Sequence, residues 1–249
     1  MMFSVFQVSR IGGRKKNEDR MGYSYTPGSA IFMVADGLGG HPQGDVAAQI
    51  CLQVVTSMFH KQAAPKLPNV AEFLHSVLYA AHEQLLSYAA VNQLTETPSS
   101  TLVVTVLQDD HCYTAHCGDS RRYFVRDGAV LSRTIDHSVA EWNKAPRSQM
   151  PSAAVSRHVL YSCLGAPRQP VIEVSPPIEL RVGDRLLLCS DGLWSGVEDD
   201  DIVYGLTQNA VAEAAYELAE LAVQYGGPHC DNVTLIAVAW EKSDNSAPA

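Results

Sequence analysis

The arrangement of short apolar runs along the chain limits the possible folds more than any other feature of the sequence. The runs are rich in β-branched and aromatic residues and are bounded by turn-forming residues, which is typical of β-strands. They occur in groups and do not alternate regularly with helical segments. The runs cover residues 3–9, 21–25, 29–35, 101–108, 112–117, 121–126, 172–175, 184–190 and 233–240.

Three longer segments have the residue spacing of amphipathic helices. In 44–60 and 69–92, apolar residues recur at helical spacing, so one face of each helix should be buried against a sheet. The segment 209–225 is rich in alanine and leucine and is followed by Gly226 and Gly227, a strong helix stop signal. Strands in groups, with helices inserted as blocks, favour an α+β fold over repeated βαβ units.

The length of the chain favours one domain. A single mixed domain can reach 249 residues, and we assign residues 1–242 to it. The polar segment 243–249 is expected to be a disordered tail. The segment 136–168 contains three prolines and no sustained period, so we expect a long loop that leaves the sheet. Loops of this length are usually functional or disordered.

Composition argues against several classes of protein. No apolar stretch approaches the length of a membrane span, and the N-terminus lacks the apolar core and cleavage site of a signal peptide. The six cysteines show no CxxC spacing and lie mostly in apolar runs, as thiols do in reducing compartments. We therefore expect a cytoplasmic protein that has no disulfide framework and no membrane partner.

The charge of the chain argues against nucleic acid as a partner. The formal net charge is -9, whereas a nucleic-acid-binding surface is basic. One basic cluster, Arg14 to Lys16, precedes the acidic pair Glu18 and Asp19. Taken alone, this mixed cluster would be interpreted as a solvated turn between two strands.

Carboxylates recur at the ends of the expected strands. Asp36 and Asp191 each end an apolar run and are each followed by glycine, Asp119 follows another run, and Asp231 leads into the last one. A single Asp-Gly is commonly a hairpin turn, as we expect Asp127-Gly128 to be. Several carboxylates at the edges of buried strands would repel one another if they met, unless cations neutralised them.

These oxygen ligands indicate which cation the site would prefer. Recurring carboxylates, without an HExxH pattern or paired thiolates, favour Mg²⁺ or Mn²⁺ over Zn²⁺. Two such ions ~3.5–4 Å apart activate a water and neutralise a phosphoryl group during its transfer. Arg14 would then hold a phosphate, because a guanidinium offers a planar fork to its oxygens. The pattern therefore predicts phosphoryl chemistry at a two-metal site.

A set of motifs follows the same order along the chain. They are GRKKNEDR, VADGLGGHPQGDVAA, STLVVTVL, CGDSRRYFVRDG, IDHS, LLLCSDGLW and DNVTLIAV, and they span about residues 5 to 240. Together they resemble the metal-dependent protein serine/threonine phosphatases of the 2C type, especially the compact bacterial members. The resemblance implies an αββα sandwich, in which two packed antiparallel β-sheets are flanked by helices. It also implies that 136–168 is a flap beside a metal cleft.

The resemblance implies a role for each of the central carboxylates. Asp36 would bridge two metal ions, and the carbonyl of Gly37 would join one of them. Asp191 and Asp231 would hold the first ion. The cofactors implied are two or three Mn²⁺ or Mg²⁺ ions.

The resemblance also implies roles for the remaining site residues. Glu18 or Asp19 would serve the second ion, directly or through water, and Asp119 would help to bind a third, weaker ion. Arg14 matches the phosphate-binding arginine of the family. The reaction implied is hydrolysis of phosphoserine or phosphothreonine in proteins by a hydroxide that bridges the metals.

The proton donor to the leaving oxygen stays open at this point. His41 is a candidate catalytic acid, but family members with a histidine acid carry it directly after Asp-Gly, where this chain has Leu38. A metal-bound water is the alternative. The flap also departs from the family, because HVLYSCLG replaces the usual arginine-containing sequence before Leu-Gly. We therefore expect substrate preference to differ, with metal binding unaffected.

The run HCYTAHC contains two histidines and two cysteines but is not expected to bind zinc. Alternate residues of a strand face opposite sides, so Cys112 and His116 share one face while His111 and Cys117 share the other. Four ligands cannot converge from this strand. We expect His137 in the flap or the cleft, without a catalytic role.

Two other functions stay open. The chain could be a catalytically silent relative that binds phosphoproteins or regulates a kinase, although such forms lose metal carboxylates and all of them are present here. It could also hydrolyse small phosphate esters. As partners we expect phosphorylated serine/threonine proteins and a cognate bacterial serine/threonine kinase, and we expect a monomer.

Overall fold

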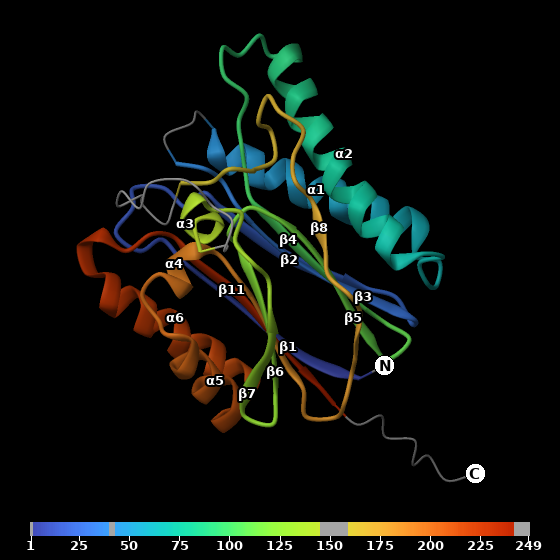
Figure 1. Ribbon diagram of the computed structural model, residues 1–249, viewed down its shortest axis with the longest axis vertical. Helices are drawn as coiled ribbons and strands as arrows, with labels where there is room; N and C mark the ends of the chain where they lie inside the picture. The colour runs from blue at the N-terminus through green and yellow to red at the C-terminus, as the bar shows by residue number, and fades with distance from the viewer. Residues whose placement is uncertain (1, 40–42, 145–158, 242–249) are drawn as a thin grey trace.

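Two antiparallel β-sheets pack face to face, and helices cover the outer face of each (Figure 1). The structure is a computed structural model and describes residues 2–39, 43–144 and 159–241. The α+β class and the αββα sandwich expected from the sequence are confirmed. The expected tail 243–249 lies outside the described residues, and the assignment of residues 1–242 to one domain stays a prediction.

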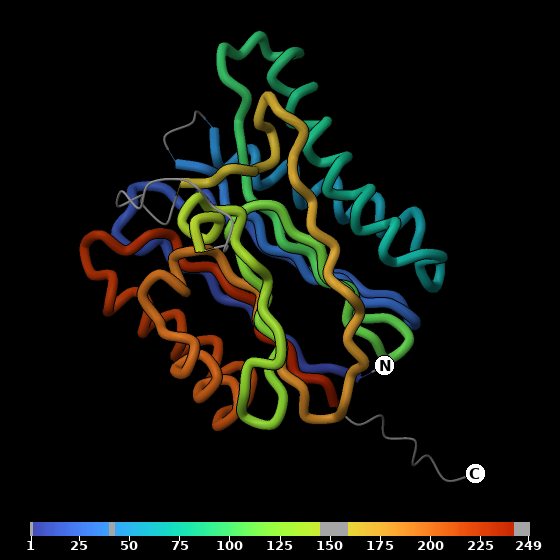
Figure 2. The backbone as a smooth tube through the Cα atoms, viewed as in Figure 1, coloured from blue at the N-terminus to red at the C-terminus, as the bar shows by residue number. Residues whose placement is uncertain are grey.

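The first sheet contains both the first and the last strand of the chain. Its order is β1-β11-β10-β6-β7, and the first and last strands of the chain pair along their whole length, from Phe3 opposite Trp240 to Arg10 opposite Val233. Figure 2 shows these two strands side by side, in blue and red. The strands are β1 (Phe3–Arg10), β6 (Arg121–Arg126), β7 (Ala129–Arg133), β10 (Arg185–Cys189) and β11 (Val233–Trp240).

The second sheet is six-stranded and has the order β2-β3-β4-β5-β8, with β9 also paired to β5. Neighbouring strands of this sheet are antiparallel throughout. The strands are β2 (Asp19–Tyr25), β3 (Ser29–Asp36), β4 (Leu102–Gln108), β5 (His111–Cys117), β8 (Glu173–Val174) and β9 (Ile178–Glu179).

Helices cover the outer face of each sheet (Figure 1). Helices α1 and α2 pack on the second sheet, and α5 and α6 pack on the first. Among the described helices, none combines the length and the apolar character needed to cross a membrane. The helices are α1 (Gly44–Gln62), α2 (Val70–Val91), α3 (Val139–Trp142), α4 (Asp191–Trp194), α5 (Asp199–Gln208), α6 (Val211–Gly226) and the 3₁₀ turn η1 (Gly227–His229).

The central strands are apolar on both faces because both faces are covered. In β3, Ile31 and Met33 pack under α1 and α2, while Phe32 and Val34 pack between the two sheets. Strand β11 is likewise buried along its whole length. Continuous apolar runs are therefore required here, since a polar side chain on either face would lose its hydration.

Most element boundaries agree with the sequence-based expectation, including the Asp127-Gly128 turn between β6 and β7, where φ is 51° and 75°. Sequence reasoning missed β7, β9 and α5. Strand β7 is an edge strand and is largely exposed, so its apolar pattern is weak. Helix α5 begins with consecutive aspartates, which favour a helix N-terminus through the helix dipole.

A buried ion pair ties the first sheet to the start of the segment 136–168. The guanidinium of Arg121 donates two hydrogen bonds to Asp136, at 2.8 and 2.7 Å, and a third to the hydroxyl of Tyr123. It also lies 3.7 Å from the ring centroid of Trp194 in α4. The pair is nearly inaccessible to solvent. Breaking it would therefore leave a buried charge without its counter-ion.

We predict that Asp136→Ala lowers the free energy of unfolding by about 3 kcal/mol, because the Arg121 charge stays buried after its partner is lost. Urea denaturation of the two proteins measures the difference. Glu220→Ala is the matched control, since it breaks the more exposed Arg10–Glu220 pair and should cost less than about 1 kcal/mol. Equal losses in both variants would contradict the assignment of Arg121 and Asp136 as a structural pair.

Candidate metal and phosphate site

The strand ends at one end of the sandwich bring the predicted carboxylates together. A cavity of about 500 Å³ is lined by Arg14, Asp36, Asp119, Asp191 and Asp231, together with residues of α4, α6 and η1. A second cavity of about 260 Å³ shares part of this lining and adds other residues near the N-terminus. Its site residues are Arg14, Glu18, Asp36, Gly37 and Asp231.

Asp36 is held at the end of β3 by its backbone. Its N–H donates to the hydroxyl of Thr101, and its carbonyl accepts from the Thr101 N–H and the Ser100 hydroxyl. These bonds leave the carboxylate to line the cavity. The pKa of Asp36 is raised well above its usual value. Loss of hydration is the largest cause, and repulsion from Asp19 and Asp191 adds to it.

Glycine is required directly after Asp36. A Cβ on Gly37 would lie 2.1 Å from the carbonyl oxygen of Gly44 at the start of α1. A Cβ on Gly44 would in turn lie 2.9 Å from Oε1 of Glu18. The absence of both side chains lets β3, α1 and Glu18 approach one another closely. This explains the Asp-Gly pattern at this position as a packing requirement.

The acidic pair divides between two environments. Glu18 lines the smaller cavity, whereas Asp19 is buried and pairs with Asp36 across β2 and β3. The Ser190 hydroxyl donates to Oδ2 of Asp19 at 2.7 Å, and Oδ1 has no hydrogen-bond partner among the described residues. Burial raises the pKa of Asp19 to about 7. A cation would satisfy this oxygen and favour its charged form.

Asn232 fixes the loop that carries Arg14. The side-chain Nδ2 of Asn232 donates to the backbone carbonyls of Ile11 and Lys16, at 2.9 and 3.0 Å. Its side-chain Oδ1 accepts from the backbone N–H of Glu18 at 2.8 Å. The loop turns at Gly12, which has φ of 60°, and a Cβ there would lie 2.1 Å from the carbonyl of Asp231. Neither Asn232 nor Ser190 was predicted from the sequence to have a role in the site.

Arg14 extends from this loop into the cavity. One Nη donates to Oδ2 of Asp231 at 2.6 Å, and this bond raises the pKa of Arg14. Asp231 also caps the loop locally, because its Oδ1 accepts from the N–H of Asn232 at 2.8 Å. A guanidinium has further N–H groups beyond the one used here. These remain to bind an anion at the same cavity.

Asp119 and Asp191 line the same cavity and are connected through α4. Asp191 occupies the first turn of this helix. The indole N–H of Trp194, in the same helix, donates to the carbonyl of Asp119 at 3.0 Å. Trp194 therefore holds the turn that carries Asp119, and the same side chain packs on Arg121.

The residues present fit hard divalent cations. The donor set consists of carboxylates and a backbone carbonyl, which Mg²⁺ and Mn²⁺ prefer over nitrogen or sulfur ligands. Burial and repulsion from neighbouring carboxylates raise the pKa of Asp36, and one buried oxygen of Asp19 has no hydrogen-bond partner among the described residues. A bound cation would relieve both. The site thus combines an acidic pocket for cations with an arginine for an anion.

His41 lies outside the described residues, so its position relative to the cavity is not defined. The segment 136–168 is described except for 145–158. Leu160 lines the larger cavity, which places this residue beside the carboxylates. The assignment of 136–168 as a flap stays a prediction.

A cavity that offers carboxylates to cations and an arginine to an anion is suited to metal-dependent phosphatase chemistry. The family model of protein phosphatase 2C matches residues 7–222. The chain therefore belongs to the protein phosphatase 2C family.

Named relatives and solved structures agree with this assignment. The chain is 31% identical to the serine/threonine protein phosphatase PstP of Mycobacterium tuberculosis over 227 residues, which is 90% of this chain and 42% of PstP. It is 27% identical to the serine/threonine phosphatase stp of Listeria welshimeri, with 95% of both chains covered. The chain thus spans less than half the length of PstP but nearly all of stp.

The structural comparison extends the likeness to a metal-bound protein. The catalytic domain of PstP in complex with two manganese ions matches with a TM-score of 0.77 and 28% identity, covering 96% of this chain and 99% of that one. The likeness supports metal dependence of this chain.

We predict that Asp36→Asn stabilises the protein in the presence of chelator, because it removes one charge from a group of mutually repelling carboxylates. In wild-type protein, Mn²⁺ should raise the melting temperature by several degrees, since a ligand that binds only the folded state stabilises it. The variant should lose most of this rise. Melting curves with chelator and with Mn²⁺ measure both effects.

The matched control for this prediction is Asp200→Asn, an exposed carboxylate in the first turn of α5. It should leave the effect of Mn²⁺ on the melting temperature unchanged. A full Mn²⁺-dependent rise in Asp36→Asn would contradict the placement of the metal at this residue.

Proposed function

We propose that the chain removes phosphate from phosphoserine and phosphothreonine in proteins, as a metal-dependent hydrolase. The observation that carries this proposal is the convergence of Asp36, Asp191 and Asp231 with Arg14 around one cavity. Membership of the protein phosphatase 2C family and the names of the relatives support it.

We assign the carboxylates to two ions, which we propose to be Mn²⁺ or Mg²⁺. Asp36, which lines both cavities, would bridge them, with the carbonyl of Gly37 on one ion. Asp191 and Asp231 would hold the first ion. When bound, such ions supply a water nucleophile that is ionised near neutral pH and positive charge next to the phosphoryl oxygens.

The remaining carboxylates complete this proposal. Glu18 lines the smaller cavity and would serve the second ion. Asp19 is buried behind it and would act on the same ion directly or through water. Asp119, which lines the larger cavity, would help to hold a third ion.

Arg14 would bind and orient the phosphate. Its bond to Asp231 fixes the guanidinium at the cavity, so its free N–H groups face a substrate with little loss of side-chain entropy. His41 is our candidate for the proton donor to the leaving oxygen, and a water held by a metal ion would be the alternative.

We also propose a cellular setting. All six cysteines are free thiols, as in a reducing compartment, and we propose that the protein acts in the cytoplasm as a monomer. Its partners would be the phosphorylated substrates of a cognate bacterial serine/threonine kinase. The net charge of -9 supports protein and not nucleic acid as the partner.

Phosphate release tests the proposal. Wild-type protein is incubated with a phosphothreonine peptide and with p-nitrophenyl phosphate, in Mn²⁺, Mg²⁺ or chelator. We expect metal-dependent hydrolysis of the peptide that falls by more than about a hundredfold in Asp191→Asn, with Asp200→Asn as the control that retains it. Binding of the peptide without hydrolysis would favour the silent module, and hydrolysis of the small ester alone would favour a small-molecule phosphohydrolase.

We predict that Arg14→Ala raises KM for the phosphopeptide by roughly tenfold to a hundredfold, because charge-assisted hydrogen bonds to the phosphate are lost. Steady-state kinetics in saturating Mn²⁺ measure the change. Lys61→Ala, which removes an exposed cation at the end of α1, is the control and should leave KM unchanged. An unchanged KM in Arg14→Ala would remove this residue from phosphate binding.

A further inference from the structure

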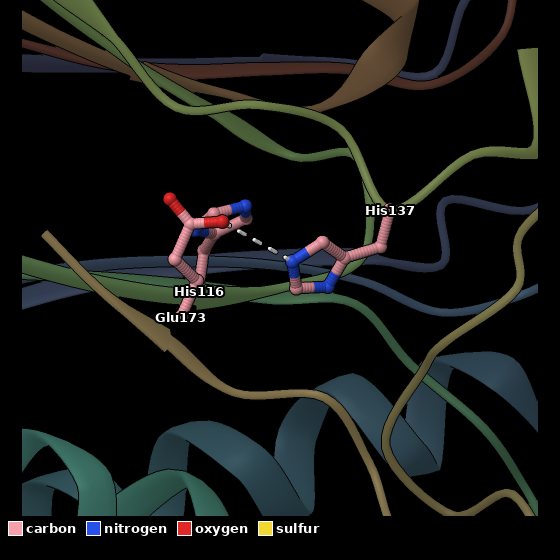
Figure 3. Close-up of side chains that lie close together, drawn as sticks. All are labelled: His116, His137 and Glu173. Carbon is pink, nitrogen blue, oxygen red and sulfur yellow. Dashed lines mark ion pairs between the residues drawn. The ribbon is translucent and has the colours of Figure 1, made fainter. Parts of the chain in front are cut away.

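A second cluster of metal-ligating side chains lies outside the carboxylate site. His116 at the end of β5, His137 after β7 and Glu173 in β8 point toward one another (Figure 3), and one donor atom from each lies within 4.8 Å of the other two. His116 and Glu173 are directly opposite in the β5–β8 pairing, so their side chains share one face of the sheet. None of the three lines the cavity of the carboxylate site.

The hydrogen bonds of His116 leave one ring nitrogen without a partner. Nε2 lies 2.8 Å from the carbonyl of Ile135, and since a carbonyl only accepts, Nε2 carries the proton. Nδ1 therefore holds a lone pair. This atom has no hydrogen-bond partner among the described residues. Water cannot readily supply one, because the residue is only 1% exposed.

His137 has the opposite arrangement. Its Nδ1 accepts from the backbone N–H of Gly118 at 3.2 Å, so the proton is on Nε2. This Nε2 is also buried without a hydrogen-bond partner in the described part of the chain. The nearest anionic oxygen, Oε2 of Glu173, is 3.9 Å away, beyond hydrogen-bond distance.

Both imidazoles are neutral, which makes them available as ligands. Burial lowers the pKa of His116, and burial together with the His116 ring lowers the pKa of His137 to about 3. The two ring centroids are 4.5 Å apart. A buried polar atom without a hydrogen-bond partner destabilises the folded state, so two of them facing one carboxylate indicate a missing binding partner.

We propose that His116 Nδ1, His137 Nε2 and the Glu173 carboxylate form a binding site for Zn²⁺, separate from the carboxylate site and inhibitory to it. Two imidazoles and one carboxylate are a ligand set that Zn²⁺ favours, in contrast to the all-oxygen set for Mn²⁺ or Mg²⁺. The hydrogen bond from Nε2 of His116 to the carbonyl of Ile135 is of the kind that orients a metal-binding histidine.

The geometry requires a modest closure of the cluster. Ligand bonds of about 2.0–2.1 Å place tetrahedral donors about 3.3 Å apart, whereas the present donors lie up to 4.8 Å apart. The side chain of Glu173 is 44% exposed and lies on a two-residue strand, so it is free to move toward the two rings. Its exposed side is also the route by which the ion and its remaining water ligands would enter.

Binding at His137 has a consequence for the neighbouring turn. Nε2 must release its proton to bind the ion, and a neutral imidazole then carries its proton on Nδ1. The N–H of Gly118 would face this N–H and lose its acceptor. Gly118 has φ of 104° and directly precedes Asp119. The inhibitory effect follows from this loosened turn, and this part of the inference rests on the proposed function of Asp119.

Cobalt spectroscopy tests binding without relying on activity. Co²⁺ is titrated into protein saturated with Mg²⁺, and visible absorption is recorded, because four- or five-coordinate cobalt with imidazole ligands absorbs more strongly than octahedral cobalt with oxygen ligands. In wild type we expect one equivalent of cobalt to give intense visible absorption. Its affinity should fall by roughly tenfold or more in Glu173→Gln, since a ligand is lost, and Zn²⁺ should displace the cobalt.

The matched control is Glu179→Gln, because Glu179 lies in β9 and also pairs with β5, opposite His111. It should retain the wild-type spectrum. His116→Asn provides a second variant, with circular dichroism to confirm its fold. Equal cobalt spectra in Glu173→Gln and wild type, or no intense absorption in any of the proteins, would overturn the zinc site.

Inhibition is measured separately with the same variants. In saturating Mn²⁺, the Zn²⁺ concentration that halves phosphatase activity should rise by roughly tenfold or more in Glu173→Gln and stay unchanged in Glu179→Gln. If cobalt binding weakens in Glu173→Gln but the sensitivity to Zn²⁺ does not, the link through Gly118 is wrong. If wild type shows no phosphatase activity, the proposed function fails while the spectroscopic result still decides the zinc site.

Discussion

Repulsion among carboxylates at one end of the sandwich is the constraint on which the rest of the structure depends. Asp36 ends β3, and Asp191 begins α4 shortly after β10. Both strands are buried, so the core fixes where the two carboxylates enter the cavity. The fold therefore holds negative charges together at a cost in free energy that bound cations would recover. Stability of the sandwich and occupancy of the site are linked for this reason.

The acidic end is held in place by polar residues between elements that are far apart in the sequence. The Ser190 hydroxyl accepts from the N–H of Thr234 at 3.0 Å and donates to Asp19 at 2.7 Å, which joins the two sheets. Asn232 joins the last strand to the N-terminal loop through bonds to Ile11 and to Glu18. These contacts make the carboxylates part of a rigid frame, and preorganised charge of this kind is what electrostatic catalysis requires.

The sequence predicted the carboxylates well because their signal is local. An apolar run that ends in Asp-Gly can be recognised within ten residues, and the order of such runs carried the family resemblance. Asn232 and Ser190 have no such local signal, since their importance comes only from which strands they join. Gly37 was recognised from the sequence as part of an Asp-Gly pattern. The need for glycine there comes from the close approach of Gly44 and Glu18, which depends on the packing of α1.

The run HCYTAHC also shows what residue spacing within one strand does not predict. The argument that one strand cannot supply converging ligands was correct for the strand alone, and Cys112 and Cys117 do lie in different core clusters. His116 meets its potential co-ligands only because β8 pairs beside it and the chain after β7 returns over it. Ligand sets of this kind are defined by sheet topology, which residue spacing within one strand does not encode.

Asp119 is the point where these two parts of the molecule meet. On one side, its carbonyl accepts from Trp194, which packs on the buried Arg121–Asp136 pair. On the other side, the preceding Gly118 exchanges hydrogen bonds with both the backbone and the ring of His137. The Trp194 side is reinforced by the bidentate, charged Arg121–Asp136 pair behind it. The ring of His137 contributes one neutral bond to Gly118. This ring bond is therefore the easier of the two supports to break, and the turn carrying Asp119 is the element through which events outside the carboxylate site would reach it.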